Sequence, residues 1–194
     1  QNMAHVVLQS LQLLDKKPNL DSWKKLVDTI KNPTKTFKIA IAGKYTGLSD
    51  AYISVVESLK HAGYAHHAKI DIKWINSEDC TDMKKAKEVL SDVDGLVVPG
   101  GFGVRGIEGK LNAIRYAREN NLPFLGLCLG MQCSVIEYAR NVVGSKDANS
   151  MEFNEGTPYP VIDIMLEQKN IENMGGTMRL GKNDCVLKKG TKAY

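Results

Sequence analysis

The pattern of apolar and polar residues divides the chain into a helical front segment and a longer segment of alternating elements. Within residues 1–15 four apolar residues recur at helical spacing, namely Val7, Leu8, Leu11 and Leu14. A second set recurs in the same way shortly afterwards, namely Trp23, Leu26, Val27 and Ile30. The spacing predicts two amphipathic helices, with Asp21 as the N-cap of the second and Pro33 just beyond its end. We expect residues 1–20 to be the end of a preceding domain or a linker helix, and residues 21–194 to form the next domain.

From Phe37 onward, short apolar runs alternate with segments of helical periodicity. The pattern predicts strands at residues 37–42, 69–74, 95–98 and 122–127, and helices at residues 50–61, 81–90, 108–120 and 129–143. In the first of these helices Ile53, Val56 and Leu59 are expected to face inward, with Gly63 closing it. After Gly144 the rhythm is lost, although residues 161–165 and 184–187 could be strands. Regular alternation predicts the α/β class: a flavodoxin-like three-layer sandwich with a mostly parallel central sheet.

Composition narrows the possible functions only modestly. The hydrophobic share is 43%, charged residues make up 25%, and the formal net charge is +4. No apolar run approaches the ~20 residues of a membrane span, and no secretory signal is recognisable. Lysines 84, 85 and 87 are expected to be a solvated helix face, because no aromatic residues accompany them as in nucleic-acid sites. We therefore expect a cytoplasmic protein that contacts neither membranes nor nucleic acid.

The four cysteines point to free thiols. They are Cys80, Cys128, Cys133 and Cys185. None forms a C-x-x-C pair and no histidine lies at zinc-site spacing, so no metal site is expected. Free thiols fit a reducing compartment.

Cys128 lies in a sequence typical of a nucleophile turn. An apolar strand runs into Gly126-x-Cys128-x-Gly130 and then into a helix, which is the G-x-S-x-G turn with cysteine in place of serine. A strand that reverses into a helix within one residue leaves no room for a Cβ at the flanking positions, and the helix N-terminus favours a thiolate. The alternative is a buried cysteine that happens to lie between glycines. Cys133, without such glycines, is expected to be a core residue.

A glycine-rich loop precedes this turn at the end of the preceding strand. Its residues Gly101-x-Gly103-x-x-Gly106 formally match the dinucleotide-binding fingerprint. That fingerprint requires an acidic residue at the end of the next strand, and the next strand ends at Cys128 instead. A better interpretation is an oxyanion hole, formed by the backbone N–H groups of Gly101 and Leu129 over the sulfur. The site is thus expected at the carboxyl ends of two neighbouring strands.

Several motifs resemble class I, triad-type glutamine amidotransferases, and in particular the glutaminase domain of CTP synthases. They are Pro-Gly-Gly-Phe-Gly at 99–103, Gly-Leu-Cys-Leu-Gly-Met-Gln at 126–132, Ala-Gly-Lys-Tyr at 42–45, Asp-Ala-Tyr-x-Ser-Val-x-Glu-x-Leu-x-His-Ala-Gly at 50–63, Asp-Ala-Asn-Ser-Met-Glu-Phe at 147–153 and Met-Gly-Gly-Thr-Met-Arg-Leu-Gly at 174–181. The cysteine turn is shared by many hydrolases, whereas the last two motifs are more specific. The resemblance covers about residues 21–194.

The resemblance implies a role for each matching residue. Cys128 would attack the side-chain amide of L-glutamine, giving a thioester and ammonia. Gly101 and Leu129 would stabilise the oxyanion, and Gln132 and Glu152 would hold the amino acid, Glu152 at its α-ammonium group. Without the resemblance, Glu152 would be interpreted as a surface acid in a loop.

The family also implies partners outside this domain. Ammonia would pass to a synthetase domain of the same polypeptide, which aminates UTP with ATP and Mg²⁺ in a homotetramer, while this domain itself needs no cofactor. GTP would activate the glutaminase, with Phe102, Arg105 and Arg179 as candidate contacts; each arginine could equally be a solvated loop residue.

Part of the catalytic triad is missing from the printed sequence. The family uses a histidine and, two residues later, a glutamate downstream of the cysteine, whereas the histidines here all precede Cys128: His5, His61, His66 and His67. The domain is therefore expected to be incomplete at its C-terminus. Two alternatives stay open: a cysteine hydrolase or chaperone of the DJ-1 type, and a degenerate amidotransferase fold without catalysis.

Overall fold

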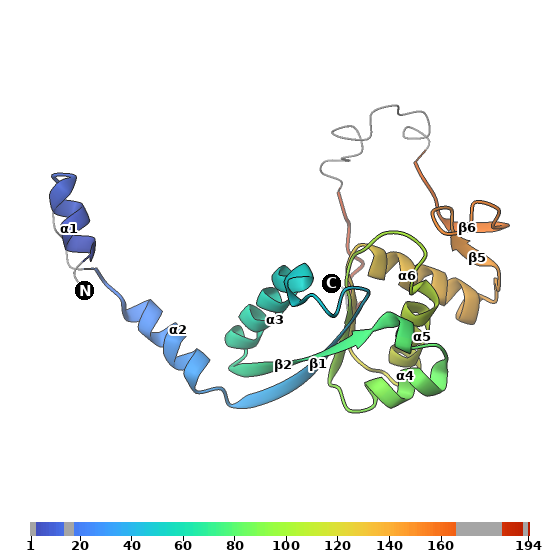
Figure 1. Cartoon of the computed structure of the whole chain (residues 1–194), viewed down its shortest axis with the longest axis horizontal. Helices are drawn as coiled ribbons and strands as arrows, with labels where there is room; N and C mark the ends of the chain where they lie inside the picture. The colour runs from blue at the N-terminus through green and yellow to red at the C-terminus, as the bar shows by residue number, and fades with distance from the viewer. Residues whose placement is uncertain (1–2, 14–17, 166–183, 192–193) are drawn as a thin grey trace.

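A four-stranded parallel sheet forms the centre of the molecule. The computed structural model describes residues 3–13, 18–165, 184–191 and 194. The strands are β1 (Lys35–Gly43), β2 (Ala68–Asn76), β3 (Gly95–Val98) and β4 (Phe124–Gly126), in the order β2-β1-β3-β4. Every neighbouring pair is parallel, so the carboxyl ends of all four strands share one edge. Figure 1 labels β1 and β2 of this sheet.

Helices cover both faces of this sheet. Helices α4 (Met83–Leu90), α5 (Ile107–Glu119) and α6 (Leu129–Tyr138) pack on one face, in a core that includes Leu96 and Val98. Helix α3 (Ile53–Ala65) lies on the other face, where it lines an apolar groove together with Val97. Successive strand residues point to opposite faces, so these contacts place α3 opposite α4–α6. The predicted α/β sandwich is confirmed.

The two N-terminal helices lie outside this sandwich. Helix α1 (Met3–Ser10) and helix α2 (Asp21–Lys31) bury none of their residues, and they extend away from the sheet in Figure 1. Asp21 is wrong as the N-cap of α2: Leu20 occupies that position, and the Asn19 side chain instead accepts a hydrogen bond from Asp21 N at 2.9 Å. The domain boundary at residues 20–21 stays a prediction. No helix of the described ranges has the length and apolarity needed to cross a bilayer.

Helix α3 differs from its predicted form. It begins after a short 3-10 turn, η1 (Ser49–Tyr52), and Gly63 lies buried within it rather than closing it. A Cβ at Gly63 would lie 2.7 Å from the Ala68 carbonyl oxygen, so the glycine permits close packing on β2. Ile53, expected inside, is 57% exposed.

The segments after α6 also depart from expectation. A π-helical turn, η3 (Ala139–Val143), extends α6 to the predicted end. Strand β6 (Tyr159–Ile162) begins two residues earlier than the predicted strand and pairs in parallel with β5 (Ala148–Ser150), which the pattern did not indicate. The predicted strand at residues 184–187 is wrong, since this stretch has no regular structure and Val186 is almost fully exposed. A short 3-10 turn, η2 (Ser77–Asp79), follows β2.

Candidate active site

Cys128 occupies a sharp turn between β4 and α6. It is the N-cap residue of α6, with φ 53° and ψ −108°, a backbone conformation that L-residues rarely adopt, and it is exposed. A Cβ at Gly126 would lie 2.6 Å from the Gly130 carbonyl carbon, and one at Gly130 would overlap the Val98 carbonyl group. The two glycines are therefore required for the turn to pack against itself and against β3. The predicted turn, with no room for a Cβ at either flanking glycine, is confirmed.

Cys133, one turn and a half further along α6, has the opposite surroundings. It is fully buried, and burial raises the pKa of its thiol to about 11. Burial likewise raises the pKa of the Cys80 thiol to about 11. Both residues belong to the apolar core, as predicted for Cys133, and both are poor nucleophiles because the thiol form dominates near neutral pH.

The glycine-rich loop after β3 lies directly beside the cysteine turn. A Cβ at Gly100 would be 3.4 Å from Cys128 Cβ and 3.8 Å from its sulfur, and one at Gly101 would be 3.4 Å from Leu129 Cδ2. Within the described ranges, neither the Gly101 nor the Leu129 backbone N–H donates a hydrogen bond to another residue. Two amide donors thus remain available next to the exposed sulfur, as an oxyanion hole requires.

Two charged side chains hold this loop from outside. The buried Lys44, just beyond β1, donates from Nζ to the carbonyl oxygens of Phe102 (2.6 Å) and Gly103 (2.7 Å). Glu152, in the turn after β5, accepts from the Gly103 backbone N–H at 2.9 Å. The Lys44 ammonium group therefore fixes the carbonyl groups of residues 102 and 103, and the Glu152 carboxylate fixes the amide of residue 103.

Lys44 is a residue whose role the sequence did not reveal, and Tyr52 fixes it in turn. The Tyr52 hydroxyl accepts hydrogen bonds from the backbone N–H groups of Lys44 (3.1 Å) and Tyr45 (3.3 Å). These contacts join two of the motifs quoted above. Burial lowers the pKa of Lys44, and the Arg105 guanidinium lowers it further. The available signal was its place at the carboxyl end of β1, since ligands of parallel sheets bind at that edge.

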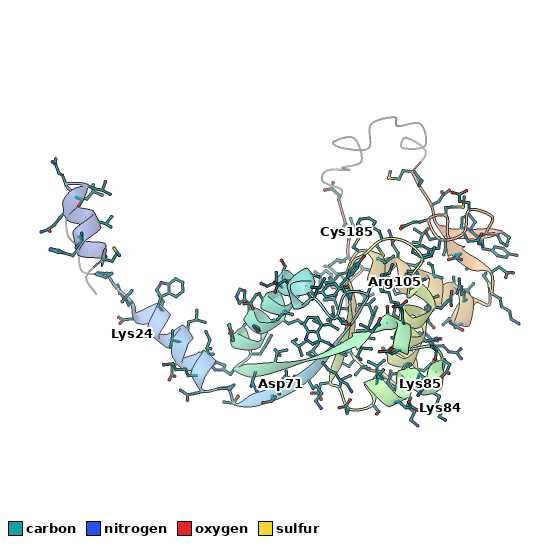
Figure 2. The ribbon with its side chains drawn as sticks, in the orientation of Figure 1. Lys24, Asp71, Lys84, Lys85, Arg105 and Cys185 are labelled. Carbon is teal, nitrogen blue, oxygen red and sulfur yellow. The ribbon has the colours of Figure 1, made fainter. Side chains whose placement is uncertain are left out.

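The other predicted residues fall around the same loop. Gln132 is half-buried in the first turn of α6, and its N–H donates to the Cys128 carbonyl oxygen at 3.1 Å. Phe102 is 82% exposed at the tip of the loop. Arg105 lies 5.8 Å from the centroid of the Tyr45 ring and 3.4 Å from a Glu78 carboxylate oxygen; its position is labelled in Figure 2. Arg179 lies outside the described residues.

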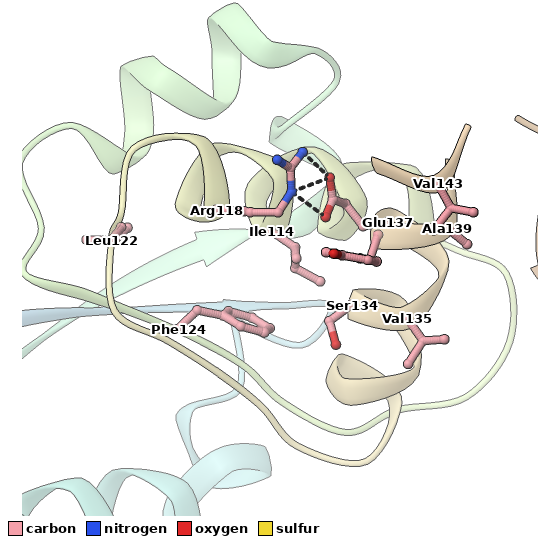
Figure 3. Close-up of a pocket in the computed structure, with 10 residues that line it drawn as sticks. Ile114, Arg118, Leu122, Phe124, Ser134, Val135, Glu137, Ala139 and Val143 are labelled. Carbon is pink, nitrogen blue, oxygen red and sulfur yellow. Dashed lines mark hydrogen bonds and ion pairs between the residues drawn. The ribbon is translucent and has the colours of Figure 1, made fainter. Parts of the chain in front are cut away.

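A cavity lies away from Cys128, between α5, α6 and β4. It measures about 650 Å³, and its lining includes Ile114, Phe124, Val135 and Tyr138 but not Cys128. Figure 3 shows its polar wall, where Arg118 forms a bidentate ion pair with Glu137, with N···O distances from 2.8 to 3.2 Å. The Ser134 hydroxyl in its lining donates to the Met131 carbonyl oxygen at 2.6 Å, and no histidine lines the cavity to act as its base, so its size alone does not make it the active site. No group of three metal-binding side chains comes together within the part of the chain described above.

A family model agrees with this geometry. The model for class-I glutamine amidotransferases matches residues 47–194. The chain belongs to this family. The match includes the Cys128 turn, the glycine-rich loop and Glu152, although Lys44 precedes it.

Known relatives of this amidotransferase chain are CTP synthases. The chain is 56% identical to the CTP synthase of Clostridium beijerinckii and 54% identical to that of Geobacillus kaustophilus, over all 194 residues in each case. It spans 36% of the length of these relatives. It also resembles the solved glutaminase domain of the Trypanosoma brucei CTP synthase with bound acivicin. The TM-score is 0.65 and the identity 43%, covering 69% of this chain and 52% of that one.

Proposed function

We propose that this chain is the glutaminase domain of a CTP synthase and that Cys128 is its nucleophile. The observation that carries the proposal is the position of the exposed Cys128 sulfur beside the glycine-rich loop, which Glu152 of a CTP-synthase-like motif holds at Gly103. A DJ-1-type hydrolase would share the cysteine turn but would not require this contact from Glu152.

In the proposed reaction the Cys128 thiolate attacks the side-chain amide carbon of L-glutamine. A C–S bond forms, and the carbonyl oxygen becomes an oxyanion held by the N–H groups of Gly101 and Leu129. The C–N bond then breaks, and the nitrogen leaves as ammonia after taking up a proton. Water hydrolyses the thioester to glutamate and restores the thiol. We expect the histidine and glutamate that move these protons to follow Tyr194 in the whole protein.

Substrate binding is assigned to Glu152 and Gln132. Glu152 Oε1 accepts from Gly103 N, so its second carboxylate oxygen is available for the α-ammonium group of glutamine. Gln132 lies one turn after the nucleophile and can bind a polar group of the same substrate.

The proposal for the whole protein follows from the relatives. Ammonia would pass to a synthetase domain that aminates UTP with ATP and Mg²⁺, in a homotetramer activated by GTP. The exposed Phe102 ring can stack on a base, and Arg105 can pair with phosphate; Arg179 is the third candidate contact.

Replacing Cys128 by serine in the protein expressed from the complete gene tests this proposal. CTP formation from UTP and ATP is measured with either L-glutamine or ammonium chloride as the nitrogen source. The glutamine-dependent rate should fall at least ~10³-fold, as for loss of a triad member, while the ammonia-dependent rate stays unchanged. A Cys133→Ser variant serves as the control. Retention of the glutamine-dependent rate in Cys128→Ser would refute the proposal.

A further inference from the structure

A lysine is buried beneath the glycine-rich loop. Lys110 lies in the first turn of α5, is 0% exposed and is the largest fully buried side chain of the described residues. A Cβ at Gly101 would lie 3.7 Å from Lys110 Nζ and 3.4 Å from Leu129 Cδ2. The amine is therefore adjacent to Gly101, one of the two residues whose amides are assigned to the oxyanion hole, and Leu129 approaches the same point.

The Lys110 amine has no partner that would explain its burial. Among the described residues its Nζ makes no hydrogen bond, and no salt bridge to a carboxylate is formed. The titratable groups that influence it are Cys133 and Cys128 of the α6 region and Lys44 after β1. Burying an unpaired amine disfavours its charged form; accordingly, burial lowers the pKa of Lys110, and the Lys44 charge lowers it further.

Neither Lys44 nor Cys133 can supply the missing negative charge. Lys44 carries the same charge and already donates to two loop carbonyls. Cys133 is fully buried, and the pKa of about 11 keeps it a thiol. The remaining group is Cys128, which is exposed at the N-terminus of α6 and becomes negative when it acts as a nucleophile.

We propose that Lys110 is a positioning residue whose buried ammonium group favours negative charge on the Cys128 sulfur and on the oxyanion beside Gly101. This inference rests on the proposed function, because both charges arise only in nucleophilic attack. Lys110 acts through the electrostatic field across the loop and touches neither substrate nor sulfur. In a water-poor interior a positive charge acts over a longer distance than in water, because little solvent screens it.

The test compares the pH dependence of Cys128 alkylation in the wild-type chain and in Lys110→Met. Each protein is treated with iodoacetamide between pH 6 and pH 10, and mass spectrometry gives the labelling rate of Cys128 relative to the exposed Cys185 of the same molecule. An ammonium group that favours negative charge on the Cys128 sulfur should speed the alkylation of that sulfur. At pH 7 the Cys128-to-Cys185 ratio should therefore fall about tenfold in Lys110→Met, the order expected for loss of one charge–charge interaction. The difference should shrink at the highest pH, where a lysine amine loses its charge. Lys84→Met, a substitution on the exposed face of α4 (Figure 2), should change nothing.

Thermal melting of the same variants separates this role from a structural one. Because the folded-state pKa of Lys110 lies below its unfolded value, the amine reduces stability at neutral pH, and this penalty disappears as pH rises toward about 10.4. Lys110→Met should thus melt at or above the wild-type temperature at pH 7, with a smaller gain near pH 10.

Each contrary result overturns the inference. A folded Lys110→Met with an unchanged labelling ratio at every pH would show that its charge does not act on Cys128. A variant that melts lower or does not fold would assign Lys110 a structural role instead. Neither outcome affects the glutaminase proposal, which stands or falls with the Cys128→Ser assay.

Discussion

At the residue scale, the backbone of Cys128 shows what the nucleophile turn costs. Its φ of 53° and ψ of −108° lie where a side chain is strained. Such a conformation persists only because α6 and β3 pack around it, with Gly130 closely apposed to Val98. The strained turn exposes the sulfur at the sheet edge, where a substrate can reach it.

Replacing Cys128 by glycine should therefore stabilise the fold while removing the thiol. Cys128→Ala is the matched control, because it removes the sulfur but keeps a Cβ in the strained conformation. The glycine variant should exceed the alanine variant in unfolding free energy by about 1 kcal/mol, measured by urea denaturation. Equal stability of the two variants would mean that the turn is not strained.

Glu152 offers a second test at this scale. Removing its carboxylate releases Gly103 N and, on our proposal, also the glutamine α-ammonium group. In the protein expressed from the complete gene, Glu152→Ala should lower glutamine-dependent CTP formation about 100-fold, as for loss of a charge-assisted contact of ~3 kcal/mol. Ammonia-dependent formation should change little.

The neighbouring acid provides the control for that experiment. Glu155 is exposed in the same loop and forms no ion pair with another described residue, so Glu155→Ala should leave both rates unchanged. Equal losses of the two activities in Glu152→Ala would remove Glu152 from the glutamine site.

Sequence reasoning succeeded for residues whose chemistry is local. The glycines that flank Cys128 are forced by a turn of five residues, so the motif alone predicts that neither position has room for a Cβ. Lys44 was missed because its hydrogen-bond partners come from a distant part of the chain, and Lys110 because only the fold brings its amine beside Gly101. Nothing near Lys110 in sequence distinguishes it from the exposed lysines of α4, and only tertiary packing buries it.

At the scale of elements, a buried ion pair joins α5 to α6. Glu137 is 1% exposed and accepts three hydrogen bonds from the partly exposed Arg118. Asn141 adds a further contact at 3.2 Å. The pair therefore closes the helix interface beside the apolar cavity of Figure 3.

Removal of one partner of this pair should be costly. Arg118→Met leaves the Glu137 carboxylate buried without its cation, so the unfolding free energy should fall by about 3 kcal/mol in urea denaturation. Arg115→Met breaks only the exposed pair with Glu119 and should cost below about 0.5 kcal/mol. Similar small losses of unfolding free energy in both variants would show that the Arg118–Glu137 pair stabilises the fold no more than an exposed pair does.

Helices and strands with a strong hydrophobic periodicity were predicted well, and those whose position depends on tertiary packing were predicted poorly. The four strands of the central sheet were predicted from short apolar runs, and helices α4, α5 and α6 from apolar residues at helical spacing. The burial of the inward face of α3 was overestimated. The groove between α3 and the sheet is only partly covered, and Leu125 of β4 stays exposed. The strand β5 has only three residues, too few to give a period.

At the scale of the whole molecule, the topology explains why the site lies where it does. Parallel order brings the ends of β1, β3 and β4 to one edge, so Lys44, the glycine-rich loop and Cys128 meet there. The segment after α6 returns to this edge and supplies Glu152. The fold class therefore predicted the location of the site, whereas the contribution of Glu152 depended on a specific motif.

The central claim is that Cys128 is the thiol of a glutamine site, and labelling with an electrophilic glutamine analogue tests it most directly. The 194-residue chain is incubated with the analogue, with and without excess L-glutamine, and mass spectrometry maps the modified cysteine. Our account predicts modification at Cys128 that L-glutamine suppresses, while Cys185, which is also exposed, reacts more slowly and without such protection. Labelling of Cys185 at the same rate as Cys128, or labelling of Cys128 that glutamine does not slow, would contradict the account.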